Sequence, residues 1–208
     1  MLAQTLLDRP RMFNHNRGLW GYTGTAPDGT QLTIQSSGMG GPSAAIVVSE
    51  LAQLGARSIV RVGTCGALDV SLELGQLVLV GQAVAADGTS RALGAGERVQ
   101  ADPGLLRAFA RAGAPAAQTV VSSDLFYDPN AGREQAWREA GVVAVEMECA
   151  TVFALAARLR LTAAGVLVVS DLLGRRRVRI TKDGLRAAER RMGELTTRAF
   201  ALTGDGPG

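Results

Sequence analysis

The chain has 208 residues, of which 47% are hydrophobic, and its formal net charge is +3. This length and apolar content suffice for one well-formed core, so we predict a single domain over residues 1–208. A membrane-spanning helix needs about 18 or more consecutive apolar residues, and the sequence has no such run. One His and two Cys cannot build an ordinary zinc site, which argues against a metal centre.

The first residues, MLAQTLLDRPRMF, lack the basic and then apolar segments of a signal peptide. Cys65 and Cys149 lie far apart in apolar or glycine-rich surroundings, so a disulfide framework is not expected. Both observations predict a protein of the reducing cytoplasm.

Strand and helix signals alternate along the chain. Two strand-like runs joined by a turn at 27–29 predict a hairpin within 19–38. Pro42 and Gly55 bracket a predicted helix at about 42–55. Further strands are predicted at 56–63, 73–84, 117–124, 142–148 and 162–171. Further helices are predicted at 102–113, 130–141, 149–159 and 180–202, and a surface loop is expected near 92–97.

Because several of these strands are apolar throughout, we predict an α/β fold with a mostly parallel sheet covered by helices on both faces. Ligands bind at the carboxyl ends of strands in such sheets. Polar or glycine-rich segments follow five of the predicted strands, at 38–41, 61–66, 122–127, 146–148 and 170–171. Together they offer a cation, hydroxyls, backbone amides, an aromatic face and carboxylates, which suits an anion, a diol and a flat base.

The run VAVEMECATVFALA carries Glu146 and Glu148 inside an apolar segment, where an unpaired carboxylate is costly. A carboxylate can accept hydrogen bonds from two adjacent hydroxyls, so Glu148 suits the 2′- and 3′-hydroxyls of ribose. Arg61 stands in an apolar strand, and with Thr64 and nearby glycine amides it suits a phosphate. Taken singly, the glycine turns, Phe126 and Asp171 are also compatible with ordinary turns, core and a helix cap; their joint occurrence favours a site.

The segment GRRRVRITK, residues 174–182, is the one basic run. It could contact nucleic acid or form a solvated loop that leads into the last helix. No stacking aromatics are interleaved with its arginines, so we favour the loop and expect no nucleic-acid partner.

Six segments resemble the hexameric nucleoside phosphorylases, the family of bacterial purine nucleoside phosphorylase, uridine phosphorylase and archaeal-type methylthioadenosine phosphorylase. They are NRGLWGYTGT, GMGGPSAAIVVSEL, RVGTCGAL, SSDLFY, VAVEMECATVFALA and VVSD, in family order. The resemblance implies a three-layer α/β/α sandwich around a mixed, mostly parallel sheet, and a hexamer built as a trimer of dimers. It also implies phosphorolysis of purine nucleosides to a free base and ribose 1-phosphate, with inorganic phosphate as co-substrate and no other cofactor.

By the same resemblance, Arg61 and Thr64 bind phosphate, and Arg17 reaches the phosphate site of a neighbouring subunit. The nucleoside-binding positions are Met39, Cys65, Gly66, Phe126, Glu146, Met147, Glu148 and Ser170. Asp171 is the expected general acid, with a pKa raised towards neutrality so that it can protonate purine N7. Arg190 is the expected assistant of Asp171.

The sequence departs from the family at its beginning, where a Gly-Asp-Pro-x-Arg segment that completes the phosphate site is not found. This departure predicts a weakened phosphate site and poor phosphorolysis for the 208-residue chain. It leaves open a nucleoside-binding protein with little turnover.

Other substrates stay open as well. Methylthioadenosine is the nearest alternative substrate. Uridine is less favoured, because the Gln-x-Arg pair that reads uracil does not follow Phe126 and Tyr127 at the family spacing. A hydrolase that uses water in place of phosphate is disfavoured by Arg61.

Overall fold

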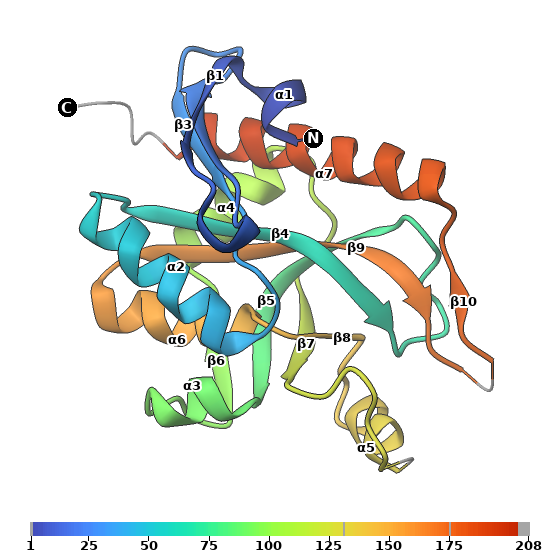
Figure 1. The fold of residues 1–208 in the computed structure, drawn as a ribbon. Coiled ribbons are helices and arrows are strands. Elements are labelled where there is room, and N and C mark those ends of the chain that lie inside the picture. Colours follow the sequence, from blue (N-terminus) through green and yellow to red (C-terminus); the bar gives the residue numbers. More distant parts are fainter. Residues whose placement is uncertain (1, 131, 175, 204–208) are drawn as a thin grey trace.

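The structure is a computed structural model and describes residues 2–130, 132–174 and 176–203. Its centre is a seven-stranded sheet with the order β10-β9-β4-β8-β7-β5-β6 (Figure 1). The strands are β4 (Ser58–Ala67), β5 (Leu77–Ala86), β6 (Arg98–Gln100), β7 (Gln118–Ser123), β8 (Ala144–Glu146), β9 (Thr162–Leu172) and β10 (Val178–Arg179). The pairings β4–β9, β5–β7 and β7–β8 are parallel, whereas β4–β8, β5–β6 and β9–β10 are antiparallel. The sheet is therefore mixed, as the resemblance implied.

The sheet also closes on itself. The first residues of β5, Leu77–Val80, pair antiparallel with β9, although β9 already pairs with β4. A run of pairings therefore leads from β9 through β4, β8, β7 and β5 back to β9. Apolar strand patterns carry no information on this return pairing, so the closure was not predicted. It brings the ends of strands that are distant in sequence close together.

Helices cover the sheet on two sides (Figure 1). On one side α6 (Cys149–Leu159) packs on β5, β7 and β9, and it contacts α2 (Gly41–Gln53) and α3 (Gly88–Ala92). On the other side α7 (Lys182–Ala201) packs on β9 and β4 and contacts α4 (Pro103–Arg111) and α1 (Leu2–Leu6). Between these layers lies the main core, whose fully buried members include Phe109, Leu167 and Met192. The predicted α/β class is confirmed.

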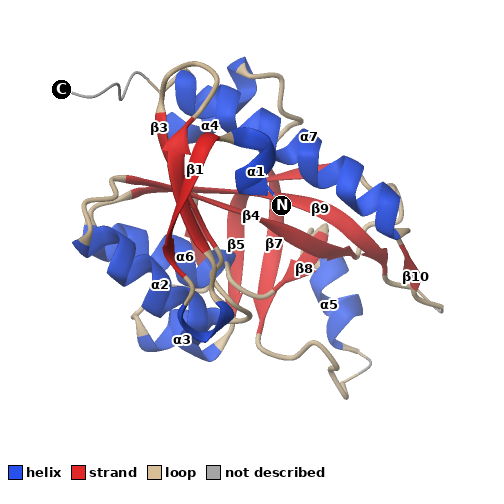
Figure 2. Ribbon diagram, turned by 45° about the horizontal axis from the view of Figure 1, so that its top comes forward, coloured by secondary structure: helices blue, strands red, loops and turns tan. Residues whose placement is uncertain are grey.

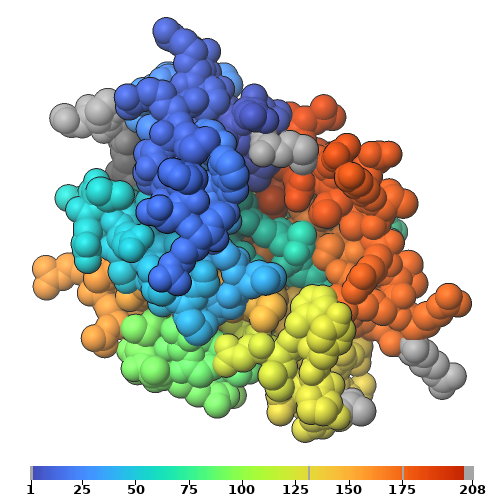
Figure 3. All heavy atoms as spheres, viewed as in Figure 1, coloured from blue at the N-terminus to red at the C-terminus, as the bar shows by residue number. Residues whose placement is uncertain are grey.

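The N-terminal strands form a small sheet of their own, with the order β1-β2-β3 (Figure 2). Strands β2 (Gly21–Thr25) and β3 (Gln31–Gln35) are the predicted hairpin, whereas β1 (Asp8–Asn14) was not predicted. Most β1 residues are exposed, so the strand lacks the buried alternation that marks a strand in sequence. Its Pro10 is tolerated because β1 pairs only with β2 and is an edge strand. In Figure 3 this segment, in blue, lies on the outside of the molecule.

The other predicted helices and strands are present, with small shifts at their ends. The predicted strand at 142–148 ends at Glu146, because the chain bends at Met147 and Glu148 before α6 begins. Helix α5 (Arg133–Glu139) lies within the predicted helix at 130–141, of which Ala131 is outside the described residues. Helix α3 and the short strands β6 and β10 were not predicted, since two to five residues give too short a pattern.

Helix α4 begins with a capped first turn. The carboxylate of Asp102 accepts a hydrogen bond of 2.8 Å from the backbone N–H of Leu105, and Pro103 occupies the first turn, where its missing N–H costs nothing. We expect Asp102→Ala to lower the free energy of unfolding by about 1 kcal/mol. Urea denaturation measures this change. An unchanged denaturation midpoint would show that the cap contributes nothing.

Candidate active site

The two carboxylates of the apolar run share one arginine. Glu146 and Glu148 are 4% and 5% exposed, and Arg61 lies between them. The Arg61 Nε lies 2.8 Å from Glu146 Oε2, and Arg61 Nη2 is paired with Glu148 Oε2. We call these three residues the arginine–carboxylate cluster. Buried charges are tolerable when they are paired and hydrogen-bonded, so the cluster explains why two carboxylates stand in an apolar segment.

Two glycines make room for this cluster. A Cβ atom at Gly63 would lie 2.7 Å from Arg61 Nη1, so a side chain at residue 63 would displace the guanidinium from this position. Gly40 has a φ of 81°, and its N–H donates to Glu148 Oε1. The glycine-rich segment at 38–41 is therefore tied directly to Glu148, which places Met39 beside the cluster.

Burial and neighbouring charges shift the pKa values of this cluster in opposite directions. Burial lowers the pKa of Arg61, but the nearby carboxylates of Glu146 and Glu148, with Cys149, outweigh it and the net pKa is raised. Burial raises the pKa of Glu148, and Arg61 offsets only part of that shift. Arg61 therefore stays charged. A guanidinium carries five N–H donors, so Arg61 keeps donors for a further anion after it has bonded both carboxylates.

A second cluster surrounds Asp171 near the end of β9. Its Oδ1 lies 2.7 Å from Arg177 Nε and 3.2 Å from Arg179 Nε, and its Oδ2 accepts a 2.7 Å hydrogen bond from Ser170. The Arg177 guanidinium also lies over the ring of Phe126, 4.5 Å from the ring centroid. We call Ser170, Asp171, Arg177 and Arg179 the aspartate cluster. Arg177 thus contacts both the ring of Phe126 and the carboxylate of Asp171.

The structure differs from two predictions about Asp171. Burial alone raises the pKa of Asp171, but the hydrogen bonds from Arg177 and Ser170 and the charges of Arg177 and Arg179 outweigh it, so the net pKa lies below its usual value. The predicted rise towards neutrality is therefore not found. The predicted assistant, Arg190, lies on α7, where its Nε is 4.0 Å from Glu194.

The basic segment at 174–182 supplies the arginines that contact Asp171. It is not simply a solvated loop, because β10 pairs with the end of β9 and sets Arg179 opposite Asp171. This long-range pairing gives no signal in the sequence of the segment. Arg175 lies outside the described residues.

The two clusters are linked through strands β4 and β9. Gly66 on β4 pairs with Asp171 on β9, and the Oγ of Ser170 lies 3.3 Å from the carbonyl oxygen of Cys65. Strand β4 thus carries Arg61 of the first cluster and, a few residues later, Cys65 and Gly66, which adjoin the aspartate cluster. Cys65 is buried, and burial is the main reason that its pKa is raised to about 12, so it is no nucleophile at neutral pH.

The remaining predicted residues lie at the surface. Met39 is 86% exposed and Phe126 is 54% exposed, so both present apolar side chains to solvent beside the clusters. Met147 is half-buried at the bend before α6. Thr64 and Arg17 are exposed, and among the described residues neither side chain joins the hydrogen-bond network of either cluster. The structure thus brings together most of the predicted site, but not these two.

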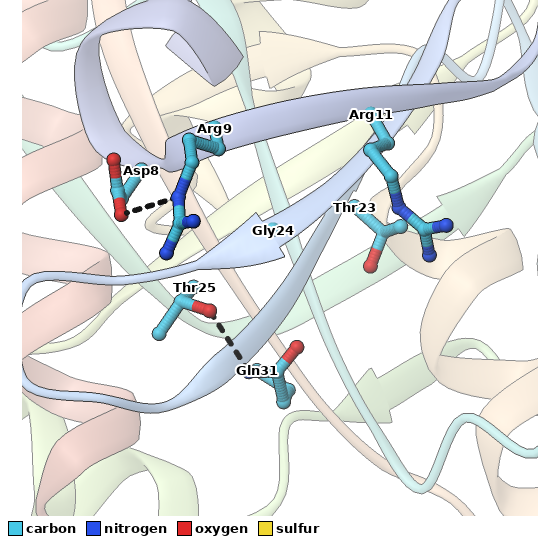
Figure 4. A pocket seen from close by; sticks show the side chains of 7 residues that line it. All are labelled: Asp8, Arg9, Arg11, Thr23, Gly24, Thr25 and Gln31. Atoms are coloured by element: carbon cyan, nitrogen blue, oxygen red, sulfur yellow. Dashed lines mark hydrogen bonds and ion pairs between the residues drawn. The ribbon is translucent and has the colours of Figure 1, made fainter.

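Two cavities lie outside the two clusters. A cavity of about 340 Å³ is lined by Asp8, Arg9, Arg11, Thr23, Gly24, Thr25 and Gln31 of the N-terminal sheet (Figure 4). Its interactions are a pair between Arg9 and Asp8, both exposed, and a hydrogen bond from Gln31 to Thr25. A second cavity of about 230 Å³ lies between β6, α4 and α6. Neither is lined by a residue of the two clusters.

The described residues offer neither a candidate metal site nor a candidate membrane span. Over residues 2–130, 132–174 and 176–203, no group of three or more His, Cys, Asp or Glu side chains could hold a metal ion. In the same ranges no helix is both long and apolar enough to cross a membrane.

The chain is similar to known proteins over most of its length. A family model described as the phosphorylase superfamily matches residues 1–201. A DeoD-type purine nucleoside phosphorylase from Geobacillus kaustophilus is 35% identical over 199 residues, which cover 92% of this chain and 81% of that protein. A guanosine phosphorylase from Halorubrum lacusprofundi is 40% identical over 153 residues, 70% of this chain and 63% of that protein.

A solved structure agrees with these relatives. Uridine phosphorylase from Vibrio fischeri superposes with a TM-score of 0.83 at 25% identity, over 95% of this chain and 84% of that one. The matching segments include both clusters, since the family model runs through β4, β8 and β9. The chain therefore belongs to the phosphorylase superfamily.

Proposed function

We propose that the protein cleaves purine nucleosides by phosphorolysis, giving a free purine and ribose 1-phosphate. One observation carries the proposal: strand β4 carries a buried arginine that pairs with a carboxylate, and its neighbour β9 carries an aspartate beside an aromatic face. Arg61 suits phosphate, Glu148 suits the ribose hydroxyls, and Phe126 suits a flat base. The curated relatives named purine nucleoside phosphorylase support the same activity.

The reaction follows from these positions. A phosphate oxygen held by Arg61 attacks C1′ as the C1′–N9 bond breaks, and the bonding electrons pass to the purine. The phosphate charge stabilises the electron-poor sugar of the transition state. A proton from Asp171 to purine N7 completes the departure of the base. Inorganic phosphate is the co-substrate, and no metal or organic cofactor takes part.

Asp171 must gain a proton before it can act, because its pKa is depressed in the free protein by Arg177 and Ser170. A purine that enters against Phe126 competes with the Arg177 guanidinium for the same ring face. It also displaces water from Asp171. Both changes raise the pKa of Asp171, so binding of the purine favours the protonated carboxyl group that acts as the general acid.

A panel of nucleosides tests the substrate class. Inosine, guanosine, adenosine, methylthioadenosine and uridine are each incubated with and without phosphate, and the free bases are measured. We expect purine nucleosides to be cleaved and uridine to be cleaved least, since uracil has no N7 for Asp171. Faster cleavage of uridine than of every purine nucleoside would contradict the proposal.

We further propose that the protein is a homo-oligomer, a hexamer arranged as a trimer of dimers. Arg17 is exposed in the short turn between β1 and β2, so it is available to a second copy. The two cysteines are free and buried, which fits a reducing cytoplasm. The ligands are small molecules; Asp171 pairs with Arg177 and Arg179 and offsets part of their charge, which leaves less charge for nucleic acid.

Assembly is tested by mixing two defective chains. If Arg17 serves a neighbouring subunit, Arg17→Ala and Asp171→Ala chains that assemble together form some sites with both residues intact. We expect the co-expressed mixture to regain activity that neither variant shows alone, and light scattering to give a particle larger than a monomer. A monomeric wild type with full activity would refute this assembly.

A further inference from the structure

Ser122 is a fully buried hydroxyl at the end of β7, 0% exposed. Its Oγ donates to Glu146 Oε1 and accepts a 2.8 Å hydrogen bond from the backbone N–H of Ala150. It therefore joins three elements: strand β7, the end of β8, and the first turn of α6. In the sequence, Ser122 belongs to the polar segment at 122–127, and no individual role was predicted for it.

Glu146 has no face left for a ligand. Its side chain is 0% exposed, and both of its oxygens accept from protein donors. Oε1 accepts from Ser122 and from the N–H of Cys149, and Oε2 accepts from Arg61 Nε and from the N–H of Glu148 at 2.9 Å. A carboxylate offers about four acceptor positions, so these four donors fill it. Glu146 was predicted to touch the nucleoside, but the structure encloses it behind Arg61 and Glu148.

We propose that Ser122 and Glu146 form a positioning pair that sets the Arg61 guanidinium for phosphate and that neither residue touches a substrate. The inference rests on the proposed function, in which Arg61 is the phosphate ligand. Glu146 holds the Arg61 guanidinium through Nε, and Ser122 holds the carboxylate of Glu146. The direction of Arg61 Nη1 is therefore set by two residues that lie outside the binding surface. Displacement of a ligand-binding group by a fraction of an ångström is costly, because the binding geometry depends on it.

The phosphate site depends on this pair more than the ribose site does. Without the hold of Glu146, Arg61 keeps only Glu148 as a partner, and the guanidinium turns towards that carboxylate. Glu148 keeps a second anchor, the N–H of Gly40. Loss of the pair is therefore expected to weaken phosphate binding while the ribose contact persists.

Two variants test the proposal. Ser122→Ala leaves the charges of the cluster unchanged, and Glu146→Gln keeps the shape of the side chain but removes its charge. Thr196→Val is the control: it also removes a buried hydroxyl, but that hydroxyl donates only within α7. Phosphate and inosine dissociation constants are measured separately by calorimetry, together with the KM for each substrate and the thermal midpoint.

We expect both variants to weaken phosphate binding by ~10-fold or more, with inosine binding changed by less than about threefold and the control unchanged. If Ser122→Ala does not fold, Glu146→Gln gives the same readout. Equal weakening of both ligands, or no change in phosphate binding in a folded variant, would overturn the positioning role while leaving phosphorolysis standing. A wild type that binds phosphate but cleaves without it would refute phosphorolysis alone.

Discussion

The Asp171→Ala variant is expected to turn over inosine about 10²-fold or more slowly than the wild type, as for loss of a general acid. The acid is needed because the purine leaves as an anion unless N7 is protonated. Steady-state kinetics at saturating phosphate measure the change in kcat. Inosine binding is expected to change little, because Glu148 and Phe126, which hold the ribose and the base, are untouched.

Asp69→Ala is the matched control for this experiment. Asp69 also has a lowered pKa, mainly from the backbone hydrogen bond of Ser71, but it lies in a surface turn outside both clusters. Its replacement is expected to leave kcat unchanged. Wild-type kcat in a folded Asp171→Ala variant would remove Asp171 from the reaction.

The Arg61→Met variant is expected to lose about 3–5 kcal/mol of unfolding free energy, the usual cost of leaving a buried charge without its partner. Arg61 is only 13% exposed and serves two carboxylates, so its loss leaves Glu146 and Glu148 buried with no counterion. Urea denaturation at neutral pH measures the loss. Phosphate binding should disappear in the same variant.

The pH dependence of this loss has a definite sign. Burial already raises the pKa of Glu148 above its usual value of 4.5, and removal of Arg61 raises it further. The folded variant therefore holds protons that the unfolded chain has released above about pH 4.5. Stability of Arg61→Met should fall as the pH rises from about 4.5 through the raised pKa, so the deficit is larger at pH 8 than at pH 5.

Two further variants complete this experiment. Glu148→Gln added to Arg61→Met removes one of the stranded charges and should recover part of the lost stability. Arg186→Met, which breaks an exposed pair with Asp183 at 3.9 Å, should change stability little. An Arg61→Met variant as stable as Arg186→Met would show that the charges of the arginine–carboxylate cluster do not stabilise the folded protein.

The sequence predicts those features that depend on local patterns. Pro42 and Gly55 locate helix α2 to within two residues at each end, because capping chemistry is local. The placement of Glu148 and Asp171 near the ends of strands also follows from local patterns, since apolar strands and the polar residues after them are visible in one sequence. Arg61 differs, because β4 continues to Ala67 and leaves Arg61 within the strand.

Features that depend on long-range pairing could not be predicted in this way. Arg177 reaches Asp171 because β10 folds back on β9, and the sequence of a two-residue strand carries no sign of its partner. Arg190 was chosen instead, but α7 directs it to Glu194. The role of Glu146 depends on which donors surround it, and these come from β4, β7 and α6. The pKa of Asp171 depends on the same long-range contact, because the hydrogen bond from Arg177 helps to lower it against the effect of burial.

The measurement that tests phosphorolysis most directly is the release of hypoxanthine from inosine with and without inorganic phosphate. If Arg61 holds the nucleophile, release requires phosphate, and one ribose 1-phosphate forms for each hypoxanthine. Release at the same rate in phosphate-free buffer, with free ribose as the product, would contradict the proposed function. No release at saturating inosine and phosphate would contradict it as well.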